Sequence, residues 1–149
     1  MKKILTFLPI NVGKWVQTVV SDKWQGLAYM EQILDWSILP ENCYGKLFVE
    51  MMNMSPEHVK EEGQLIELRL VYTQDPELYE PGTSDHGKEF VIEDSNISHK
   101  GSKRWQLKES EWFKLPRTPN VSCLWVQGKA SGGAICGLAL ANLVIAQEI

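Results

Sequence analysis

The sequence contains little cysteine, and its cysteines are widely spaced. Cys43, Cys123 and Cys136 are the only three among 149 residues, and no C-x-x-C pair or Cys/His cluster accompanies them. This pattern excludes a disulfide-rich scaffold and lacks the ligand spacing of a structural zinc site. Free thiols are typical of a reducing compartment, so we expect a cytoplasmic protein without a bound metal or cofactor.

The sequence also lacks the long apolar run that a membrane-spanning helix requires. The N-terminal stretch after Lys2 and Lys3 is apolar, but Pro9 interrupts it and no A-x-A cleavage site follows. The C-terminal run is shorter than the roughly 20 residues needed to cross a bilayer, and it contains Asn142. We therefore expect a first β-strand at the N-terminus, no secretion signal and no membrane segment.

The overall composition is that of a globular domain. Apolar residues make up 44% of the chain and charged residues 23%, with a net charge of −4. This balance is too apolar for a disordered chain, and the length predicts a single domain over residues 1–149. Six tryptophans are present, and we expect two of them on a binding or self-association surface because indole carries a polar N–H.

Alternating or β-branched stretches predict several strands. The clearest is 64–73, where Ile66, Leu68, Leu70 and Tyr72 share one face, while Leu65, Glu67, Arg69 and Val71 share the wetter one. Residues 105–113 fit either a strand or a helix. The other predicted strands are 3–9, 14–20, 45–54, 89–94 and 120–127.

Two segments show helical features. Ser21 is a candidate N-cap before a run in which Trp24, Leu27 and Leu34 fall near helical spacing, which predicts a helix over 22–36. A small-residue run rich in alanine and glycine predicts a second helix over 133–147. The expected fold class is therefore α+β, a mostly antiparallel sheet of about five to seven strands flanked by these two helices.

Charge is concentrated in the middle of the chain. The net charge is 0 over residues 1–44, −8 over 45–94 and +4 over 95–149. Residues 74–88 form a predicted loop of a length that is often functional, and they contain many of the acids. Three interpretations stay open: solvated acids that aid solubility, a surface complementary to a basic partner, or a divalent-cation site, for which the EF-hand spacing is missing.

Two further segments suggest anion binding only weakly. The basic stretch 99–105 ends in Trp105 and could contact nucleic acid, but the chain as a whole is acidic, so no nucleic-acid partner is expected. Residues 128–133 are glycine-rich and precede the predicted second helix, a context that suits phosphate. They match neither G-x-x-x-x-G-K-[ST] nor G-x-G-x-x-G.

One combination of residues is compatible with catalysis. Cys136 lies one turn into the predicted second helix, where the helix N-terminus would lower the pKa of its thiol. His86, which follows Asp85, is the candidate base. This gives an alternative function, a small thiol-dependent hydrolase or transferase, although a cysteine among alanines and glycines is more often a small buried hydrophobe.

The leading hypothesis is a non-enzymatic, cytoplasmic protein-binding domain. Its acidic middle region and its tryptophan content favour a small inhibitor, of the immunity-protein or antitoxin type, that occludes a basic partner protein. The expected partner-binding residues lie in the long loop: Asp75, Glu77, Tyr79, Glu80 and Asp85.

Overall fold

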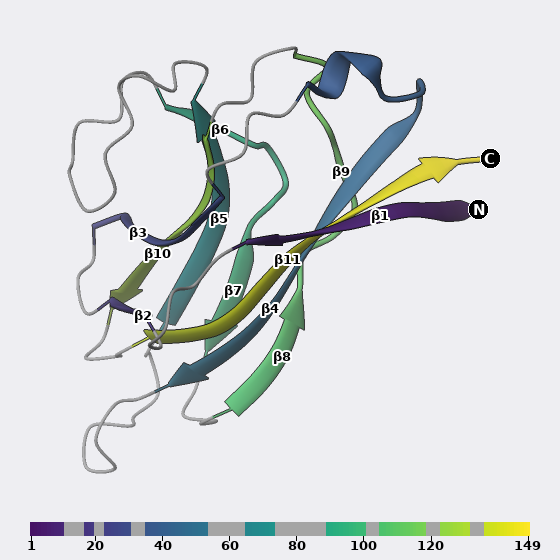
Figure 1. Ribbon diagram of the computed structural model, residues 1–149. Coiled ribbons are helices and arrows are strands. Elements are labelled where there is room, and N and C mark those ends of the chain that lie inside the picture. The colour runs from purple at the N-terminus through teal and green to yellow at the C-terminus, as the bar shows by residue number, and fades with distance from the viewer. Residues whose placement is uncertain are drawn as a thin grey trace.

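The chain folds into two antiparallel β-sheets packed against each other (Figure 1). The structure is a computed structural model that describes residues 1–10, 17–19, 23–30, 35–53, 65–73, 89–100, 105–118, 123–131 and 136–149. Within these ranges the helical structure consists of one short 3-10 turn, η1 (Trp36–Ile38), capped by the Asp35 carboxylate, which accepts a hydrogen bond from the Ser37 backbone N–H at 3.0 Å.

Sheet A has six strands in the order β1-β11-β4-β8, with β2 beside β11 and β9 beside β4. Its central strand, β11, is the longest in the described ranges and pairs with β1 on one side and β4 on the other. The N- and C-termini lie next to each other at one end of this sheet (Figure 1). The strands are β1 (Lys2–Ile10), β2 (Gln17–Val19), β4 (Cys43–Asn53), β8 (Trp105–Glu109), β9 (Phe113–Lys114) and β11 (Cys136–Glu148).

Sheet B has five strands in the order β3-β10-β5-β6, and β7 also pairs with β5. Strand β10 pairs with β5 over nine consecutive positions, from Cys123 opposite Thr73 to Ser131 opposite Leu65. The strands are β3 (Gln25–Met30), β5 (Leu65–Thr73), β6 (Phe90–Val91), β7 (Ile97–Lys100) and β10 (Cys123–Ser131).

A single hydrophobic core fills the space between the two sheets. Leu47 and Leu143 of sheet A and Leu68 and Leu124 of sheet B are all fully buried in one cluster. Burial of this apolar surface is the main force that holds the two sheets together. It also fixes which face of each strand points inward, and therefore which side chains remain on the outer faces.

In each sheet, one strand pairs with two short strands, and a buried serine lies between these two. Ser110 lies between β8 and β9; its hydroxyl accepts from the Leu47 N–H of β4 at 2.9 Å and donates to the Glu111 carbonyl at 2.8 Å. Ser95 lies between β6 and β7; its hydroxyl accepts from the Leu70 N–H of β5 at 3.0 Å and donates to the Ile92 carbonyl at 2.7 Å. Each hydroxyl thus satisfies a buried N–H that the break in the ladder would leave unpaired.

The predicted α+β fold class is wrong, because the second predicted helix is a strand. Residues 136–148 form β11, which pairs along its length with β4. Because β11 is central, both of its edges are paired, and Leu143, Val144, Ile145 and Ala146, which alternate between its two faces, are all buried. Periodicity does not distinguish such a strand from a buried helix, and its 13 residues exceed the usual strand length.

The first predicted helix, over 22–36, is also wrong. Its described part contains β3, which pairs with β10, and the structure ends this stretch in η1 rather than in an α-helix. The register between β3 and β10 shifts between Val126 and Gln127, the signature of a β-bulge. A bulge disturbs the two-residue alternation, which is why the apolar positions around Leu27 resembled helical spacing.

The strand predictions fared better. Strands occur within the predicted ranges 3–9, 14–20, 45–54, 64–73, 89–94 and 120–127, and the ambiguous stretch 105–113 begins with strand β8. The assignment of faces in 64–73 is confirmed for Ile66, Leu68 and Leu70, which are buried, and for Glu67 and Arg69, which are partly exposed. It is wrong for Val71, which was expected on the wetter face and is fully buried.

Candidate functional site

The five predicted partner-binding residues lie in the segment between β5 and β6. Asp75, Glu77, Tyr79, Glu80 and Asp85, together with His86, fall outside the described residues. Both flanks of the segment are described. Strand β5 ends just before it and β6 begins just after it, and Tyr72 is paired with Phe90 across the two strands. The acidic segment is therefore anchored at both ends on neighbouring positions at one edge of sheet B.

Aromatic stacking reinforces this anchor. The rings of Tyr72 and Phe90 are stacked with centroids 5.2 Å apart, and Trp36 meets Tyr72 edge to face at 6.3 Å. Burial raises the pKa of the Tyr72 hydroxyl, which keeps it neutral at physiological pH. Such aromatic pairs contribute about 0.5–1.5 kcal/mol each beyond their buried area, so both flanks of the segment are held firmly.

A polar network covers part of the outer face of sheet B next to this edge. We call it the Trp24 network; its members are Trp24, Glu67, Arg69, Glu89, Gln127 and Lys129. Its strand residues come from β5 and β10, where Arg69 is paired with Gln127 and Glu67 with Lys129. All four lie on the face opposite to the core, because the residues between them on each strand point inward.

The contacts of the network are continuous. Glu67 forms an ion pair with Lys129 at 3.3 Å, and the Lys129 ammonium lies 4.8 Å from the centre of the Trp24 ring. The Arg69 guanidinium lies 4.0 Å from the same ring. Arg69 Nε then donates to Gln127 Oε1 at 2.9 Å, and Gln127 Nε2 donates to Glu89 Oε2 at 3.2 Å.

Only part of this network was visible in the sequence. Glu67 and Arg69 were assigned to the wetter face of a strand, which is where they lie. The spacing around Trp24 instead predicts a helix, and Glu89 is identified only as one of the acids that flank the long loop. No sequence pattern marks Gln127 and Lys129 as their partners. Finding them requires the pairing of β10 with β5, and no local pattern encodes the register of two strands that lie about fifty residues apart in the sequence.

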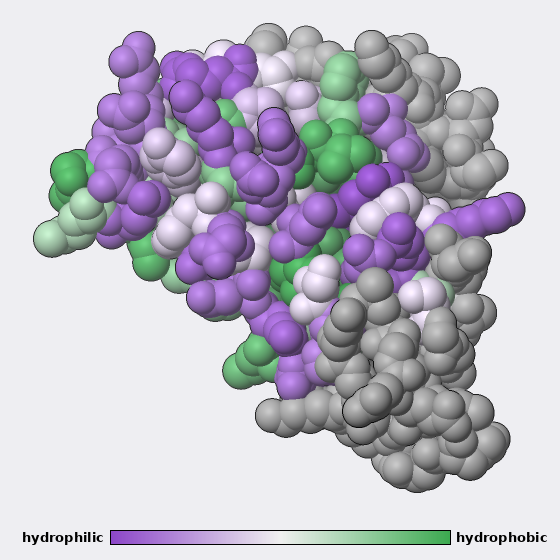
Figure 2. Space-filling view, turned by 180° about the vertical axis from the view of Figure 1, so that it is seen from behind, coloured by the Kyte–Doolittle hydropathy of each residue, from purple (hydrophilic) through white to green (hydrophobic). Residues whose placement is uncertain are grey.

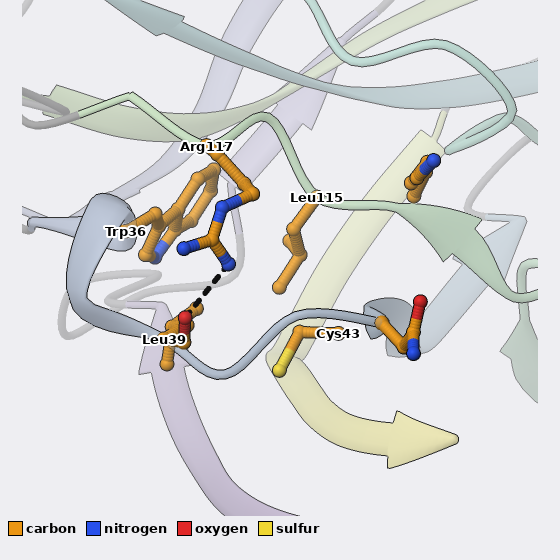
Figure 3. A pocket seen from close by; sticks show the side chains of 7 residues that line it. Trp36, Leu39, Cys43, Leu115 and Arg117 are labelled. Carbon is orange, nitrogen blue, oxygen red and sulfur yellow. Dashed lines mark hydrogen bonds between the residues drawn. The ribbon is translucent and has the colours of Figure 1, made fainter. Parts of the chain in front are cut away.

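A small pocket lies at the end of the sandwich beside η1 (Figure 3). It has a volume of about 30 Å³, which suits a water molecule rather than an organic ligand. Figure 3 shows Trp36, Leu39 and Arg117 on one side and Cys43 and Leu115 on the other. The buried Trp36 Nε1 has no hydrogen-bond partner among the described residues.

Arg117 has a structural role in this pocket. Its guanidinium donates to the carbonyl oxygens of Leu39 at 2.7 Å, Pro40 at 3.0 Å and Ser37 at 2.9 Å. These bonds fix the turn that follows η1. Cys43 is a free, buried cysteine, and burial raises the pKa of its thiol although Arg117 nearby opposes that shift. The thiol is therefore protonated at neutral pH and poorly nucleophilic.

The helix-based argument for Cys136 as a nucleophile is corrected by the structure. Cys136 is the first residue of strand β11 and is paired with Val19 and Asn53, so no helix N-terminus acts on it. The predicted strand-to-helix context of residues 128–133 fails for the same reason, because Gly128 and Ser131 belong to β10 and the next described element is β11.

The structure describes only some of the histidines and only part of the basic stretch 99–105. Of the histidines, the structure describes His99, which is buried on β7, while His58 and His86 lie outside the described residues. Residues 101–104 of the basic stretch also lie outside them. Within the described ranges, no three His, Cys, Asp or Glu side chains gather as metal ligands would, and no helix is long and apolar enough to cross a membrane.

The outer face of sheet A has a different character. Apolar side chains are exposed there on several strands: Ile4 and Phe7 on β1, Phe48 on β4, Leu107 on β8 and Leu140 on β11. Leu107 is 77% and Phe7 59% exposed. Seen from behind, the described surface is largely hydrophilic, with hydrophobic groups set between polar ones (Figure 2). Sheet A is thus a second candidate for contact with a partner.

No protein-family model matches the chain, and no curated protein matches it in sequence. Among solved structures, it is similar to the N-terminal CBM22-1–GH10 modules of the endo-1,4-β-D-xylanase 10B of Clostridium thermocellum complexed with xylohexaose. The identity is 12%, the TM-score 0.48, and the match covers 97% of this chain and 28% of that one. This chain thus spans less than a third of that structure's length.

Two other similar structures come from different sources. The Eiger TNF of S. frugiperda is 7% identical with a TM-score of 0.44, covering 99% of this chain and 94% of that one. A structure of infectious bursal disease virus, Gx strain, is 8% identical with a TM-score of 0.41, covering 98% and 32%. Similarities at these scores indicate no function for the present chain.

Proposed function

We propose that the chain is a non-enzymatic, cytoplasmic protein-binding domain, an acidic inhibitor that occludes a basic partner protein. The observation that carries the proposal is the anchoring of segment 74–88 between Tyr72 and Phe90 on paired strands. Binding residues are commonly carried by loops that a rigid scaffold positions. Here the scaffold is the edge of sheet B, and the segment contains four acidic residues and one lysine.

Charge complementarity gives this surface its mechanism. The acids of the segment lie in a region of net charge −8, and Glu89, the residue just before β6, adds a described carboxylate at the same edge. An acidic surface accelerates encounter with a basic partner and disfavours acidic competitors. Tyr79 would supply the apolar contact that holds the complex once it has formed. The buried, free Cys43 supports the cytoplasmic part of the proposal.

The test is capture of partners from the source cell's lysate by three forms of the protein, at low and at high salt. The first form is the wild type, and the second is E77Q/E80Q/D85N. The third, E41Q/E50Q/E111Q, is the matched control, because it removes the same charge from sheet A and its connections. Retained proteins are identified by mass spectrometry and their stoichiometry is measured.

We expect one stoichiometric basic protein on the wild type and on the control. It should be lost from the segment variant, and also at high salt, because exposed charges are screened beyond about 8 Å already at physiological ionic strength. Equal retention by all three forms, or binding that is indifferent to salt, would show that the acidic segment is not the binding element.

A further inference from the structure

Arg69 uses only part of its hydrogen-bonding capacity on the described residues. A guanidinium has five N–H donors. Arg69 donates through Nε to Gln127 Oε1 at 2.9 Å, and within the described part of the chain no hydrogen bond reaches its two terminal Nη groups. Desolvation by burial lowers the pKa of this guanidinium, and the charge of Glu89 opposes that shift. The group is thus partly removed from water, with an Nη edge that no described residue pairs.

The guanidinium is also held in one orientation. Gln127, which accepts from Nε, is 5% exposed and is itself fixed by its bond to Glu89. The Trp24 ring lies over the guanidinium at 4.0 Å. The guanidinium is thus held at two points, by the Trp24 ring and by the bond from Nε to Gln127, and this restricts the direction in which Nη1 and Nη2 point. Such preorganisation lowers the entropy cost of binding a ligand.

We propose that Arg69 is a carboxylate-binding site on the outer face of sheet B. The two Nη groups form a planar fork that matches the two oxygens of a carboxylate, so that two parallel charge-assisted hydrogen bonds form. The Lys129 ammonium shares the Trp24 ring with Arg69, but its charge is balanced by Glu67, so the binding group is the Arg69 fork itself. This site is chemically distinct from the acidic segment and does not depend on its function.

The charges around Arg69 favour a carboxylate over a phosphate. Glu67 neutralises Lys129 in an ion pair, and Glu89 lies one hydrogen-bonded residue away from Arg69. The network as a whole is therefore close to neutral, and these two acids would repel a dianion more strongly than a monoanion. The ligand is a carboxylate of a peptide or protein, either an acidic side chain or the C-terminus of a polypeptide.

The experiment is an NMR titration of the whole protein that monitors the Nε–Hε resonances of its arginine side chains. The sequence has three arginines, Arg69, Arg104 and Arg117. Arg117 is an internal control, because three backbone carbonyls already accept from its guanidinium. The probes are acetate, acetyl-alanine as a C-terminal carboxylate, acetyl-aspartamide as an aspartate-like carboxylate, phosphate, and chloride at matched ionic strength.

We expect the Arg69 and Trp24 resonances to shift saturably with acetate, while Arg117 stays in place. Whichever of the two amino-acid probes binds more tightly assigns the source of the carboxylate. Shifts that are linear and equal for all arginines, or that chloride reproduces, would overturn the proposal. So would saturation by phosphate without saturation by acetate.

Two variants separate the fork from simple charge. Arg69→Lys keeps the positive charge but removes the planar pair of donors, and it should weaken acetate binding about tenfold. Arg117→Lys makes the same change beside η1 and should leave acetate binding at Trp24 unaltered. Equal acetate binding by wild type and Arg69→Lys, both with intact folded spectra, would show that the guanidinium is not the receptor.

Discussion

Sheets A and B share one core, yet their outer faces expose different chemistry. On sheet A, apolar side chains such as Phe7 and Leu107 reach solvent. On sheet B, charged side chains are joined through Trp24 in a series of ion pairs, cation–π contacts and hydrogen bonds. Position in the sandwich therefore does not set the character of a surface. The residues at alternate positions do, once the core has fixed which of them point inward.

The two sheets share one buried structural feature. In each sheet one strand is flanked by two short strands instead of one long one, and a buried serine at the interruption between these two accepts a hydrogen bond from the unpaired backbone N–H. This serine is Ser110 in sheet A and Ser95 in sheet B. The sheets differ in the surface that lies beside the interruption. In sheet B the short strand before Ser95, β6, follows the acidic segment in the sequence, and Glu89 of the Trp24 network directly precedes that strand. Two sheets built by the same rule can therefore present surfaces of different use.

The largest expected effect is on the free energy of unfolding, and it compares two glycines: Gly45 in sheet A, which packs against the buried Phe113, and Gly26 in sheet B, which is exposed. A Cβ at Gly45 would lie 2.6 Å from the buried ring of Phe113, whereas a Cβ at Gly26 would meet its nearest atom, in Trp125, at 3.7 Å. Gly45→Ala should destabilise the fold by about 1–3 kcal/mol through overpacking. Gly26→Ala should change stability by less than about 0.5 kcal/mol.

Urea unfolding followed by tryptophan fluorescence measures both variants. Equal free energies of unfolding for Gly45→Ala and Gly26→Ala would mean that Phe113 leaves room for a Cβ at Gly45, contrary to the close contact in the structure.

The serine pair tests whether the two interruptions are equivalent. Ser95→Ala and Ser110→Ala each leave a buried strand N–H, of Leu70 and of Leu47, without its acceptor. Each should cost about 1–2 kcal/mol of unfolding free energy, because an unpaired buried donor bears its full desolvation penalty. The same unfolding experiment reports both, and a loss in one sheet alone would break the parallel between them. Ser98→Ala, at an exposed position on β7, is the control and should be neutral.

The smallest effect concerns the ends of sheet A. Glu148 accepts hydrogen bonds from Lys2 and from the Met1 amino group, and these contacts lower the pKa of its carboxyl from 4.5 to about 2. A carboxyl whose pKa is lowered by folding stabilises the fold above its unfolded pKa and loses that contribution as pH falls toward the folded value. Thermal melts of wild type and Glu148→Gln should therefore differ slightly near neutral pH and converge as pH approaches about 2. A constant difference would show that the pairing does not titrate.

The strands of the fold could be predicted where one face is buried and the other is wet. In 64–73 the alternation of Leu68 and Leu70 with Glu67 and Arg69 is visible locally, and the structure confirms a strand with that orientation. Strand β11 could not be predicted in the same way. It is paired at both edges, by β1 and β4, and residues 143–146 are buried on both of its faces. Its alanines and leucines are good helix formers, so tertiary pairing overrides local preference.

The candidate site was predictable only in its parts. The acid content of segment 74–88 is plain in the sequence, as is the polar face that carries Arg69. The neighbourhood of Arg69, Gln127 and Trp24 depends on β10 pairing with both β5 and β3. This information lies in the packing of the core, which selects the register, and not in the spacing of the polar residues themselves.

The proposed interface is sheet B with the segment anchored there, and not the apolar face of sheet A. Its most direct test is hydrogen exchange of the backbone amides with and without the captured partner, read by mass spectrometry. We expect slower exchange in residues 65–91 of the bound protein, with β1 and β8 unchanged. Slowing confined to β1, β4 and β8 would contradict the proposal and would assign the interface to the exposed apolar side chains around Phe7 and Leu107.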